Sequence, residues 1–501
     1  MHASSRHGIY SLLQQCTQTM DVEGGRHAHS LMVLCGFEHV GILCDHLLRL
    51  FACNGTLFEA NLVFNKVSMP CVHTWHAIIS AHSSLGQSKE AIVLYHRMQY
   101  EGFQPDKFIF SCVSKACGNV SDILNGRVVH DDIIRSGLEE EKFLQATLLD
   151  MYAKSGSLDD ASNMFNVVQE RDPVVWGAII SGYAQNGHSD LALKMFEQML
   201  IKDLQPDKVT FICILKACGH PQALKQGFQI HAHIIVAGFE CDVTVCNTLI
   251  DMYAKCDSWE DARRVFNNLP NRDVVSWGAL MTGYGQHEAG PQSIQLFEKM
   301  INEGLKPDKV AFACALKACA KTGALGDGRC LYDMIVRSRL ESHVIIGNSL
   351  IDLFAKCGYL DEAQKVFESL HVRNVVSWNA LLAGYVQHGN GLLVMELFQE
   401  MQQKCMAPDK VTYVCVLRAC NCIETRGLDY LIHDKFIRSG IHFDTILGNT
   451  LIDIYAKCGK LTDAYKVFNY TPSRDAVTWS AIISGYAQHG HGHQTFKLID
   501  M

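Results

Sequence analysis

Cysteine and histidine side chains recur in this chain at spacings that call for a test of metal binding. Four pairs of cysteines are five residues apart, at Cys112/Cys117, Cys213/Cys218, Cys314/Cys319 and Cys415/Cys420. Two helical residues at this spacing do not bring both sulfur atoms onto one metal ion, so small buried hydrophobic side chains are expected. His489, His491 and His493 alternate with glycine, which leaves a metal site there as a minor alternative. No metal site is predicted.

Tryptophan and lysine also recur, and both can contact nucleic acid. Five of the six tryptophans are each 101 residues apart, at Trp75, Trp176, Trp277, Trp378 and Trp479. They could stack on bases, but each lies on an apolar stripe, so core packing is favoured. The lysines keep the same interval, at Lys154, Lys255, Lys356 and Lys457. Such a row would bind a phosphate backbone without reading sequence; the alternative is a solvated cation at each helix C-terminus.

These residues recur because the chain repeats itself. The 101-residue interval divides into units of 35, 35 and 31 residues, for example 274–308, 309–343 and 344–374. A fixed period of this size indicates a stack of repeated units.

Each unit is predicted to form a helical hairpin. In the unit 445–475, one apolar stripe at helical spacing contains Leu447, Leu451, Tyr455 and Cys458, and a second contains Leu461, Ala464 and Phe468. Gly459 between the stripes suits the left-handed conformation that ends a helix.

The units start at residues 6, 41, 72, 107, 142, 173, 208, 243, 274, 309, 344, 375, 410, 445 and 476. We therefore expect one array over 6–501, with fourteen complete hairpins and a fifteenth cut off at Met501, after an extension at 1–5. One hairpin cannot bury its apolar face alone, so neighbours must stack. The predicted fold is all-α, a right-handed superhelical solenoid of helix-turn-helix hairpins. Its first helices line an inner surface that could serve as a binding groove.

The composition suits a soluble repeat protein. Of the 501 residues, 48% are hydrophobic and 19% charged, with a net charge of −8. A polyanion must therefore be met by local basic rows. The 21 cysteines are an odd number at repeating helical positions, which favours reduced thiols in an intracellular compartment. No clear targeting peptide and no apolar run of ~18 residues is found, so no membrane partner is expected.

The alternating unit lengths occur with the segments SWNALLAGYVQHGN, LIDIYAKCGKLTDAYKVF and MAPDKVTYVCVLRAC. Together these features resemble the plant organellar pentatricopeptide repeat proteins of the PLS subclass, over residues 6–501. A tetratricopeptide array would instead hold one period near ~34 residues. The resemblance implies a protein of the mitochondrion or chloroplast that binds single-stranded organellar RNA, with about one base per repeat.

In this family, the fifth and last residues of a unit read a base. Carried over to this chain, the pairs are Asn247 with Asp273, Asn348 with Asn374, Asn379 with Asp409, and Asn449 with Asp475. The resemblance implies uridine for Asn–Asp and either pyrimidine for Asn–Asn. Helix capping is an alternative role for aspartates that follow a proline and stand directly before a predicted helix. These are Asp106, Asp207, Asp308 and Asp409.

Other positions fit the family pattern less well. Repeats that lack Asn at the fifth position are expected to discriminate weakly between bases. Their fifth residues are His76, Ala146, Gly177 and Gly278. The intervening units are expected to be spacers, with Tyr10, Ser111, Ile212, Ala313 and Val414 at this position. Second-position side chains would flank the bases in the family's geometry, or else pack in the core, and these are Val275, Ile345, Val376 and Ile446. The recurring lysines resemble the family's phosphate-contacting lysine.

Many members of the subclass end in a zinc-dependent cytidine deaminase, which needs His-x-Glu and Cys-x-x-Cys. Neither motif occurs in these 501 residues. We therefore expect no enzymatic activity, no cofactor and no small-molecule substrate. The expected role is recognition for cytidine-to-uridine RNA editing, with a deaminase or editing cofactor supplied in trans and the chain stopping before the family's E/DYW extension. The alternative is a helical scaffold for protein–protein interaction.

Overall fold

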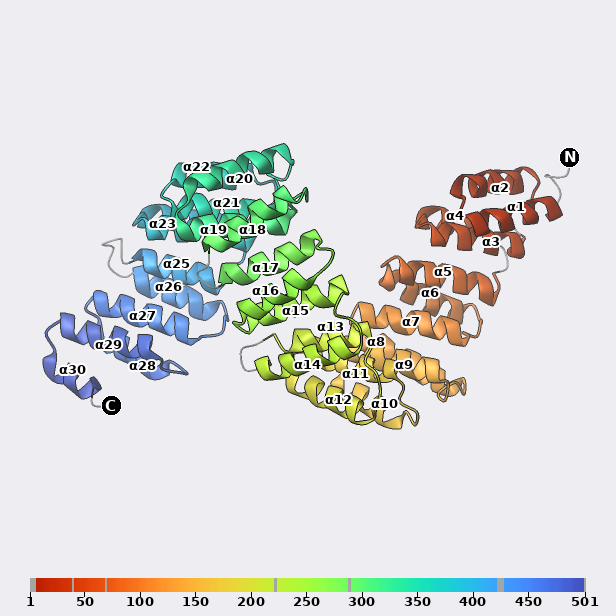
Figure 1. The fold of residues 1–501 in the computed structure, drawn as a ribbon, viewed down its shortest axis with the longest axis horizontal. Coiled ribbons are helices and arrows are strands. Elements are labelled where there is room, and N and C mark those ends of the chain that lie inside the picture. The colour runs from red at the N-terminus through yellow and green to blue at the C-terminus, as the bar shows by residue number, and fades with distance from the viewer. Residues whose placement is uncertain are drawn as a thin grey trace. The chain divides into compact units, whose positions relative to one another are not determined.

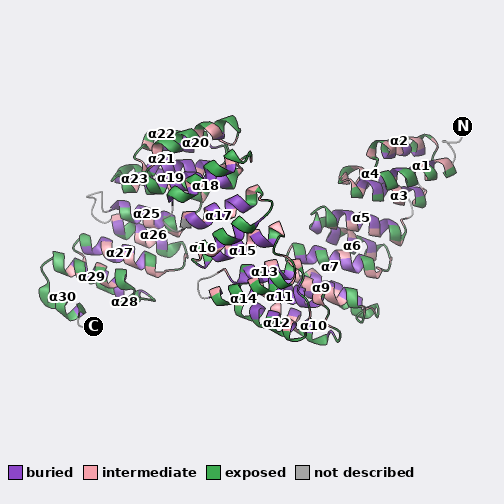
Figure 2. Ribbon diagram, viewed as in Figure 1, coloured by how far each residue is buried: buried purple, intermediate pink, exposed green. Residues whose placement is uncertain are grey.

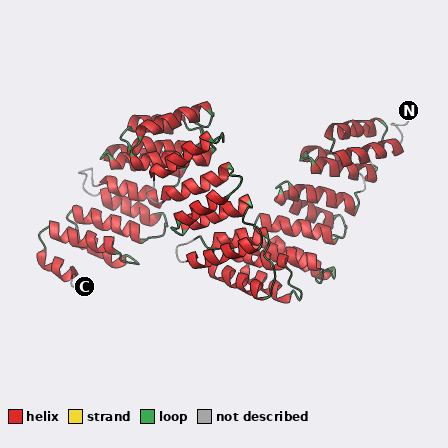
Figure 3. Ribbon diagram, viewed as in Figure 1, coloured by secondary structure: helices red, strands yellow, loops and turns green. Residues whose placement is uncertain are grey.

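The computed structural model describes residues 6–37, 40–67, 70–219, 223–286, 290–420 and 428–499. The predicted extension at 1–5 and the final residues 500–501 lie outside the described residues. Within those ranges the chain forms thirty α-helices and no strand (Figure 3). None of the helices built from the described residues is both long and apolar enough to cross a membrane.

Helices of two kinds alternate along the chain. The odd-numbered, first helices are α1 (Arg6–Thr19), α3 (Gly41–Cys53), α5 (Val72–Ser84), α7 (Lys107–Asn119), α9 (Lys142–Lys154), α11 (Pro173–Gln185), α13 (Lys208–Ala217), α15 (Val243–Lys255), α17 (Val274–Gln286), α19 (Lys309–Thr322), α21 (Val344–Lys356), α23 (Val375–Gln387), α25 (Lys410–Cys420), α27 (Thr445–Lys457) and α29 (Ala476–Gln488). The even-numbered, second helices are α2 (Val22–Leu34), α4 (Leu57–Lys66), α6 (Ser88–Tyr100), α8 (Ile123–Arg135), α10 (Leu158–Val167), α12 (Ser189–Ile201), α14 (Leu224–Val236), α16 (Trp259–Asn268), α18 (Gly290–Asn302), α20 (Leu325–Arg337), α22 (Leu360–Ser369), α24 (Gly391–Gln403), α26 (Leu428–Arg438), α28 (Leu461–Tyr470) and α30 (Gly492–Ile499).

The chain divides into two compact units, residues 1–252 and 253–501. In the first unit, each odd-numbered helix from α1 to α11 packs against the next odd-numbered helix, and each from α1 to α13 packs against its own even-numbered partner (Figure 1). In the second unit, the helices from α17 to α29 repeat this arrangement. Each of these two compact parts of the chain is therefore a stack of hairpins in which the first helices form a continuous layer.

Small residues let neighbouring first helices approach closely. A Cβ atom placed on Gly384 of α23 would lie 2.4 Å from the Cβ of Ala355 on α21, and Gly485 of α29 would meet Ala456 of α27 at the same 2.4 Å. No side chain fits at that distance, so the sequence can place only glycine there without moving the helices apart.

The apolar stripes predicted in 445–475 are buried, with one exception. Leu447, Leu451 and Tyr455 are at most 1% exposed. Cys458 is exposed because it is the C-cap residue, one position beyond the end of α27. Gly459 has a φ of 72°, the left-handed conformation predicted for the turn.

The recurring tryptophans belong to the core. Trp75, Trp176, Trp277 and Trp378 are at most 2% exposed, which confirms core packing over stacking on bases, and Trp479 is half-buried. Each tryptophan meets the edge of a phenylalanine on the preceding second helix, with ring centroids 4.7–4.9 Å apart. This contact joins the end of one hairpin to the start of the next.

An arginine completes four of these junctions. Arg373 donates from Nε to the Phe367 carbonyl at 2.9 Å and from Nη2 to the Glu368 carbonyl at 2.7 Å. Its guanidinium carbon lies 4.9 Å from the centre of the Phe367 ring. Carbonyls at a helix C-terminus have no partner within the helix, so the arginine satisfies groups that α22 leaves open. The same contacts are made by Arg171, Arg272 and Arg474.

Candidate nucleic-acid interface

Buried and exposed residues alternate along the first helices (Figure 2), and the second residue of most of them is exposed and apolar. Val275, Ile345, Val376 and Ile446 are 58%, 46%, 57% and 56% exposed. The alternative of core packing for these four side chains is therefore wrong. Equivalent exposed side chains are Ile42, Phe108, Phe143, Val174, Val209, Val310, Val411 and Val477.

Asn379 of α23 and Asp409, the residue before α25, form a hydrogen-bonded pair. Asn379 donates from Nδ2 to Asp409 Oδ1 at 2.9 Å and accepts at Oδ1 from the Thr412 hydroxyl at 2.7 Å. Asp409 Oδ1 also accepts the backbone N–H of Thr412 at 2.9 Å. Asn379 is only 7% exposed. Its amide is held from both ends, with one N–H and one lone pair left for a ligand.

Two more pairs have the same arrangement. Asn449 donates to Asp475 Oδ1 at 3.2 Å and accepts from the Thr478 hydroxyl at 2.6 Å. Asn348 donates to Asn374 Oδ1 at 3.3 Å and accepts from the Ser377 hydroxyl at 2.6 Å. The structure thus brings together three of the four predicted pairs.

The two members of the fourth pair lie in different compact parts of the chain, 1–252 and 253–501. Asn247 lies in the first unit, on α15, and Asp273 in the second, immediately before α17. Asp273 accepts the N–H of Ser276 at 2.8 Å, as expected for the residue before a helix. Pairing of Asn247 with Asp273 stays a prediction.

Hydrogen bonding keeps these carboxylates ionised. Burial alone would raise the pKa of Asp409, but hydrogen bonds chiefly from the Thr412 N–H and the Asn379 amide outweigh it, so the pKa lies below its ordinary value. The N–H of Thr478, followed by its hydroxyl, lowers the pKa of Asp475. Both side chains are therefore hydrogen-bond acceptors only at neutral pH.

Helix capping by the recurrent aspartates is confirmed. Asp106, Asp207, Asp308 and Asp409 each accept a backbone N–H from the first turn of the following helix. In every case the acceptor is Oδ1, so the cap uses one oxygen and leaves Oδ2 available. Capping and base reading can therefore be done by one carboxylate, and neither role excludes the other.

The predicted phosphate lysines are ion-paired. Lys154, Lys356 and Lys457 lie 2.7, 2.8 and 2.7 Å from the carboxylate of the aspartate four residues earlier. Their side chains are 38–52% exposed. Such pairs are worth only ~0–1 kcal/mol, so a phosphate could compete for the ammonium group. Lys255 occupies the same place in α15, and all four phosphate assignments stay predictions.

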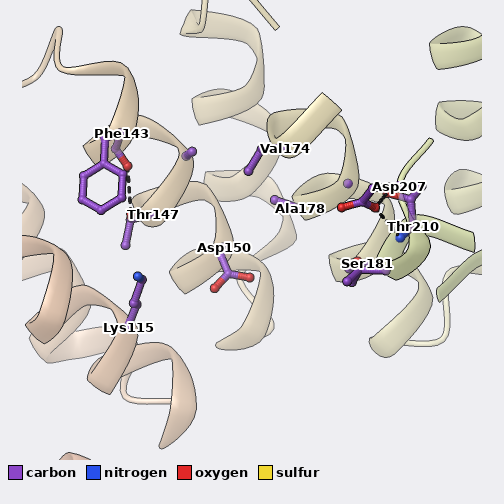
Figure 4. A pocket seen from close by; sticks show the side chains of 12 residues that line it. Lys115, Phe143, Thr147, Asp150, Val174, Ala178, Ser181, Asp207 and Thr210 are labelled. Atoms are coloured by element: carbon purple, nitrogen blue, oxygen red, sulfur yellow. Dashed lines mark hydrogen bonds between the residues drawn. The ribbon is translucent and has the colours of Figure 1, made fainter. Parts of the chain in front are cut away.

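A cavity of about 310 Å³ lies where two consecutive fifth positions are Ala146 and Gly177. Phe143 and Val174 line it, and Asp207 with Thr210 closes one side (Figure 4). A Cβ atom on Gly177 would lie 2.8 Å from the Thr210 hydroxyl oxygen. Thr210 thus approaches the backbone of α11 closely at the position that Asn379 occupies in its own repeat.

The buried hydroxyls that hold the asparagines were missed by the sequence reasoning. Ser377, Thr412 and Thr478 are fully buried and occupy the third position of α23, α25 and α29. A signal was present, because Asp or Asn followed three residues later by Ser or Thr is a helix-start pattern. The pattern marks the cap, but it does not show that the hydroxyl reaches the preceding unit.

The histidine at the end of α29 has a structural partner. His489 Nε2 lies 2.7 Å from the Ala456 carbonyl on α27, and His388 repeats this contact with Ala355 at 2.8 Å. A nitrogen that donates to a carbonyl is not available as a metal ligand. The described part of the chain holds no group of three or more side chains suited to a metal ion.

Family models match much of the chain. A model described as "PPR repeat family" matches residues 171–220, 272–321 and 373–422. One described as "PPR repeat" matches 73–103, 147–172, 244–274, 348–375, 449–472 and 477–501.

Similar proteins come from Arabidopsis thaliana. The chloroplastic pentatricopeptide repeat-containing protein At4g18520 is 30% identical over 98% of this chain and 80% of its own length. The mitochondrial protein At3g02330 is 30% identical over 98% of this chain and 56% of its own length. In three further relatives the chain spans 56–61% of the relative's length.

A solved structure has the same all-α solenoid fold. The pentatricopeptide repeat protein PPR10, in complex with an 18-nucleotide PSAJ RNA element, superposes with a TM-score of 0.60 at 19% identity. The match covers 99% of this chain and 78% of PPR10. With the stacked hairpins and the repeated pairs of side chains, these similarities show that the chain belongs to the pentatricopeptide repeat family.

Proposed function

We propose that this chain is a sequence-specific single-stranded RNA-binding protein of a plant organelle. The observation that carries the proposal is the arrangement around Asn379, Asn348 and Asn449, each held against the last residue of its unit and beside an exposed apolar side chain. An apolar wall suits the face of a base and a held amide suits its edge. The RNA named in the PPR10 complex and the organellar names of the relatives support it.

The proposal extends to the array and its role. We take residues 6–501 as one array of the PLS subclass, with fourteen complete repeats and an incomplete fifteenth. The alternating unit lengths support this assignment. Its role is recognition for cytidine-to-uridine RNA editing in the mitochondrion or chloroplast, with the deaminase or an editing cofactor acting in trans.

The pairs define a testable RNA sequence. With the N-terminal units toward the RNA 5′ end, residues 243–475 read uridine, two unspecified bases, a pyrimidine, uridine, one unspecified base and uridine. The motif is 5′-U-N-N-Y-U-N-U-3′. Asn379 and Asp409 face its fifth base.

Binding to RNAs that differ only at this fifth base tests the proposal. A guanine there should weaken binding of the parent chain by about 5- to 150-fold, which corresponds to ~1–3 kcal/mol per mismatch. Asn379→Ser, with Asp409 kept, should favour guanine, because the family pairs a small hydroxyl residue plus Asp with that base. Fluorescence anisotropy measures both affinities. Equal binding of the two RNAs by both proteins would refute this base assignment, and no RNA binding at all would refute the function.

A further inference from the structure

The first helices of the intervening units expose a cation and an apolar side chain. On α7, α13, α19 and α25 the ninth residue is exposed and basic, namely Lys115, Lys216, Lys317 and Arg418. Seven residues earlier stand the exposed second-position side chains Phe108, Val209, Val310 and Val411. Seven residues make about two helical turns, so both side chains lie on the same side of the helix. The spacer assignment for these units took account of the fifth position only.

These four cations differ from the predicted phosphate lysines in their partners. Among the described residues, no carboxylate oxygen lies within 4.0 Å of Lys115, Lys216, Lys317 or Arg418. Lys154, Lys356 and Lys457, by contrast, are each bound to an aspartate. A phosphate can therefore bind the ninth-position cations without displacing a carboxylate.

The surroundings of Lys115 show what this cation can reach. Its Nζ lies 5.6 Å from the centre of the Phe143 ring, and it lines the cavity that Val174 also lines (Figure 4). Asp150 on the same cavity is paired with Lys154 at 2.7 Å. Asp207 also lines this cavity, so Lys115 is distinguished by its lack of a carboxylate partner within 4.0 Å among the described residues and not by an excess of positive charge.

We infer that the intervening units bind the RNA sugar–phosphate backbone through Lys115, Lys216, Lys317 and Arg418. This inference rests on the proposed function. One cation recurs per 101 residues, in step with the units that carry the base-reading pairs. A single strand with a phosphate at every nucleotide supplies negative charge at each such position, and it supplies bases for the apolar neighbours. These contacts add affinity and register but read no base.

Salt dependence of RNA binding by the full chain tests the inference. The test variant carries Lys115→Gln, Lys216→Gln, Lys317→Gln and Arg418→Gln. The control carries the same change of charge on exposed residues of second helices, as Lys194→Gln, Lys299→Gln, Arg337→Gln and Lys365→Gln. The probe is a single-stranded RNA with the motif above, and a second RNA of equal length has the motif scrambled.

Each phosphate contact with a single strand contributes ~0.7 to the slope of log affinity against log salt concentration, so the test variant should lose roughly 3 from that slope. The loss should be equal for the two RNAs, and the control should keep the parent slope. A variant with Lys115→Arg, Lys216→Arg and Lys317→Arg, in which Arg418 is unchanged, should preserve the parent slope. If the parent binds RNA but the test and control variants share its slope, the inference is wrong and the proposed function stands. If the parent binds no RNA, both fail.

Discussion

At the scale of single residues, the proposed base-reading pair of Asn379 and Asp409 depends on the buried hydroxyl of Thr412. The Thr412 hydroxyl accepts the Asp409 N–H at 3.1 Å and contacts the oxygens of both members of its pair. It has one proton to donate, so it cannot satisfy Asn379 Oδ1 and Asp409 Oδ1 at the same time. Because Asn379 Nδ2 and the Thr412 N–H already donate to Asp409, the hydroxyl proton is best used on Asn379.

Thr412→Val should loosen this pair. Valine has nearly the shape of threonine but leaves Asn379 Oδ1 without its donor, which costs ~1–3 kcal/mol for a buried polar group. We expect discrimination between uridine and guanine at the fifth base to fall several-fold, while affinity for unrelated RNA changes little. Anisotropy with the two RNAs measures both.

Thr450→Val provides the matched control. Thr450 is also buried, but among the described residues its hydroxyl donates to the Ile446 carbonyl of its own helix and to no neighbouring repeat. If the two variants lose discrimination equally, the hydroxyl does not act through the pair.

Acid should weaken the contacts of Asp409. Its pKa is lowered in the folded chain, so its contribution to stability is complete above the ordinary value near ~3.9 and is lost as the pH falls through the lower folded value. Between about pH 5 and pH 2, Asp409→Asn should therefore lose less stability than the parent. Hydrogen exchange of the first turn of α25 measures this locally. Asp159→Asn, an exposed change on α10, should follow the parent curve, and identical curves for all three proteins would contradict the role of Asp409.

At the scale of elements, an arginine junction stands directly before four of the first helices, α11, α17, α23 and α29. Arg373 donates hydrogen bonds to two C-terminal carbonyls of α22 and stacks on the Phe367 ring. The next residue is Asn374, the N-cap of α23. The position of Asn374, a proposed base-reading residue, is therefore coupled to the end of α22. Arg272 and Arg474 stand directly before Asp273 and Asp475 in the same way.

Arg373→Lys should loosen this junction although the charge is kept. An ammonium group cannot reproduce the planar guanidinium that donates to two carbonyls while stacked on a ring. We expect hydrogen exchange in residues 370–377 to become faster by about tenfold, as for a local loss of ~1.4 kcal/mol.

Lys404→Gln supplies the comparison for the junction. Lys404 lies 5.4 Å from the centre of the Trp378 ring, but its ion pair with Glu400 is partly exposed and contributes little. Its exchange rates should match those of the parent. Equal acceleration in the two variants would show that any cation near the tryptophan has the same effect.

At the scale of the whole molecule, the sequence predicts periodic features better than contacts between units. The hairpins, the solenoid fold and the burial of Trp75 to Trp378 follow from a 101-residue period that aligns several copies of each position. Thr412 and Asn379 are 33 residues apart, and only the stacking of α25 on α23 brings them together. No pattern within a single unit contains that contact.

Charge was also harder to predict than burial. Each recurring lysine follows an aspartate by four residues on the same helix, a spacing that favours an ion pair. The lysines therefore do not form the row of free cations that their recurrence suggested. Lys115, Lys216, Lys317 and Arg418, which have no carboxylate within 4.0 Å among the described residues, lie on helices whose mostly apolar fifth positions predict no contact with a base.

The junction of arginine, phenylalanine and tryptophan also bears on how such a chain can change its length. Removal of residues 274–374 would join Asp273 to Val375 and recreate the order Arg, Asp, Val, Val, Ser, Trp that the chain already uses at 272–277. Unequal crossing-over between two copies would do the same. A gene of this kind can therefore gain or lose a 101-residue block while the new junction keeps a sequence that the chain already uses. Because four of these joints carry the same arginine, phenylalanine and tryptophan, the solenoid can change its number of 101-residue blocks while the remaining blocks keep their own side chains.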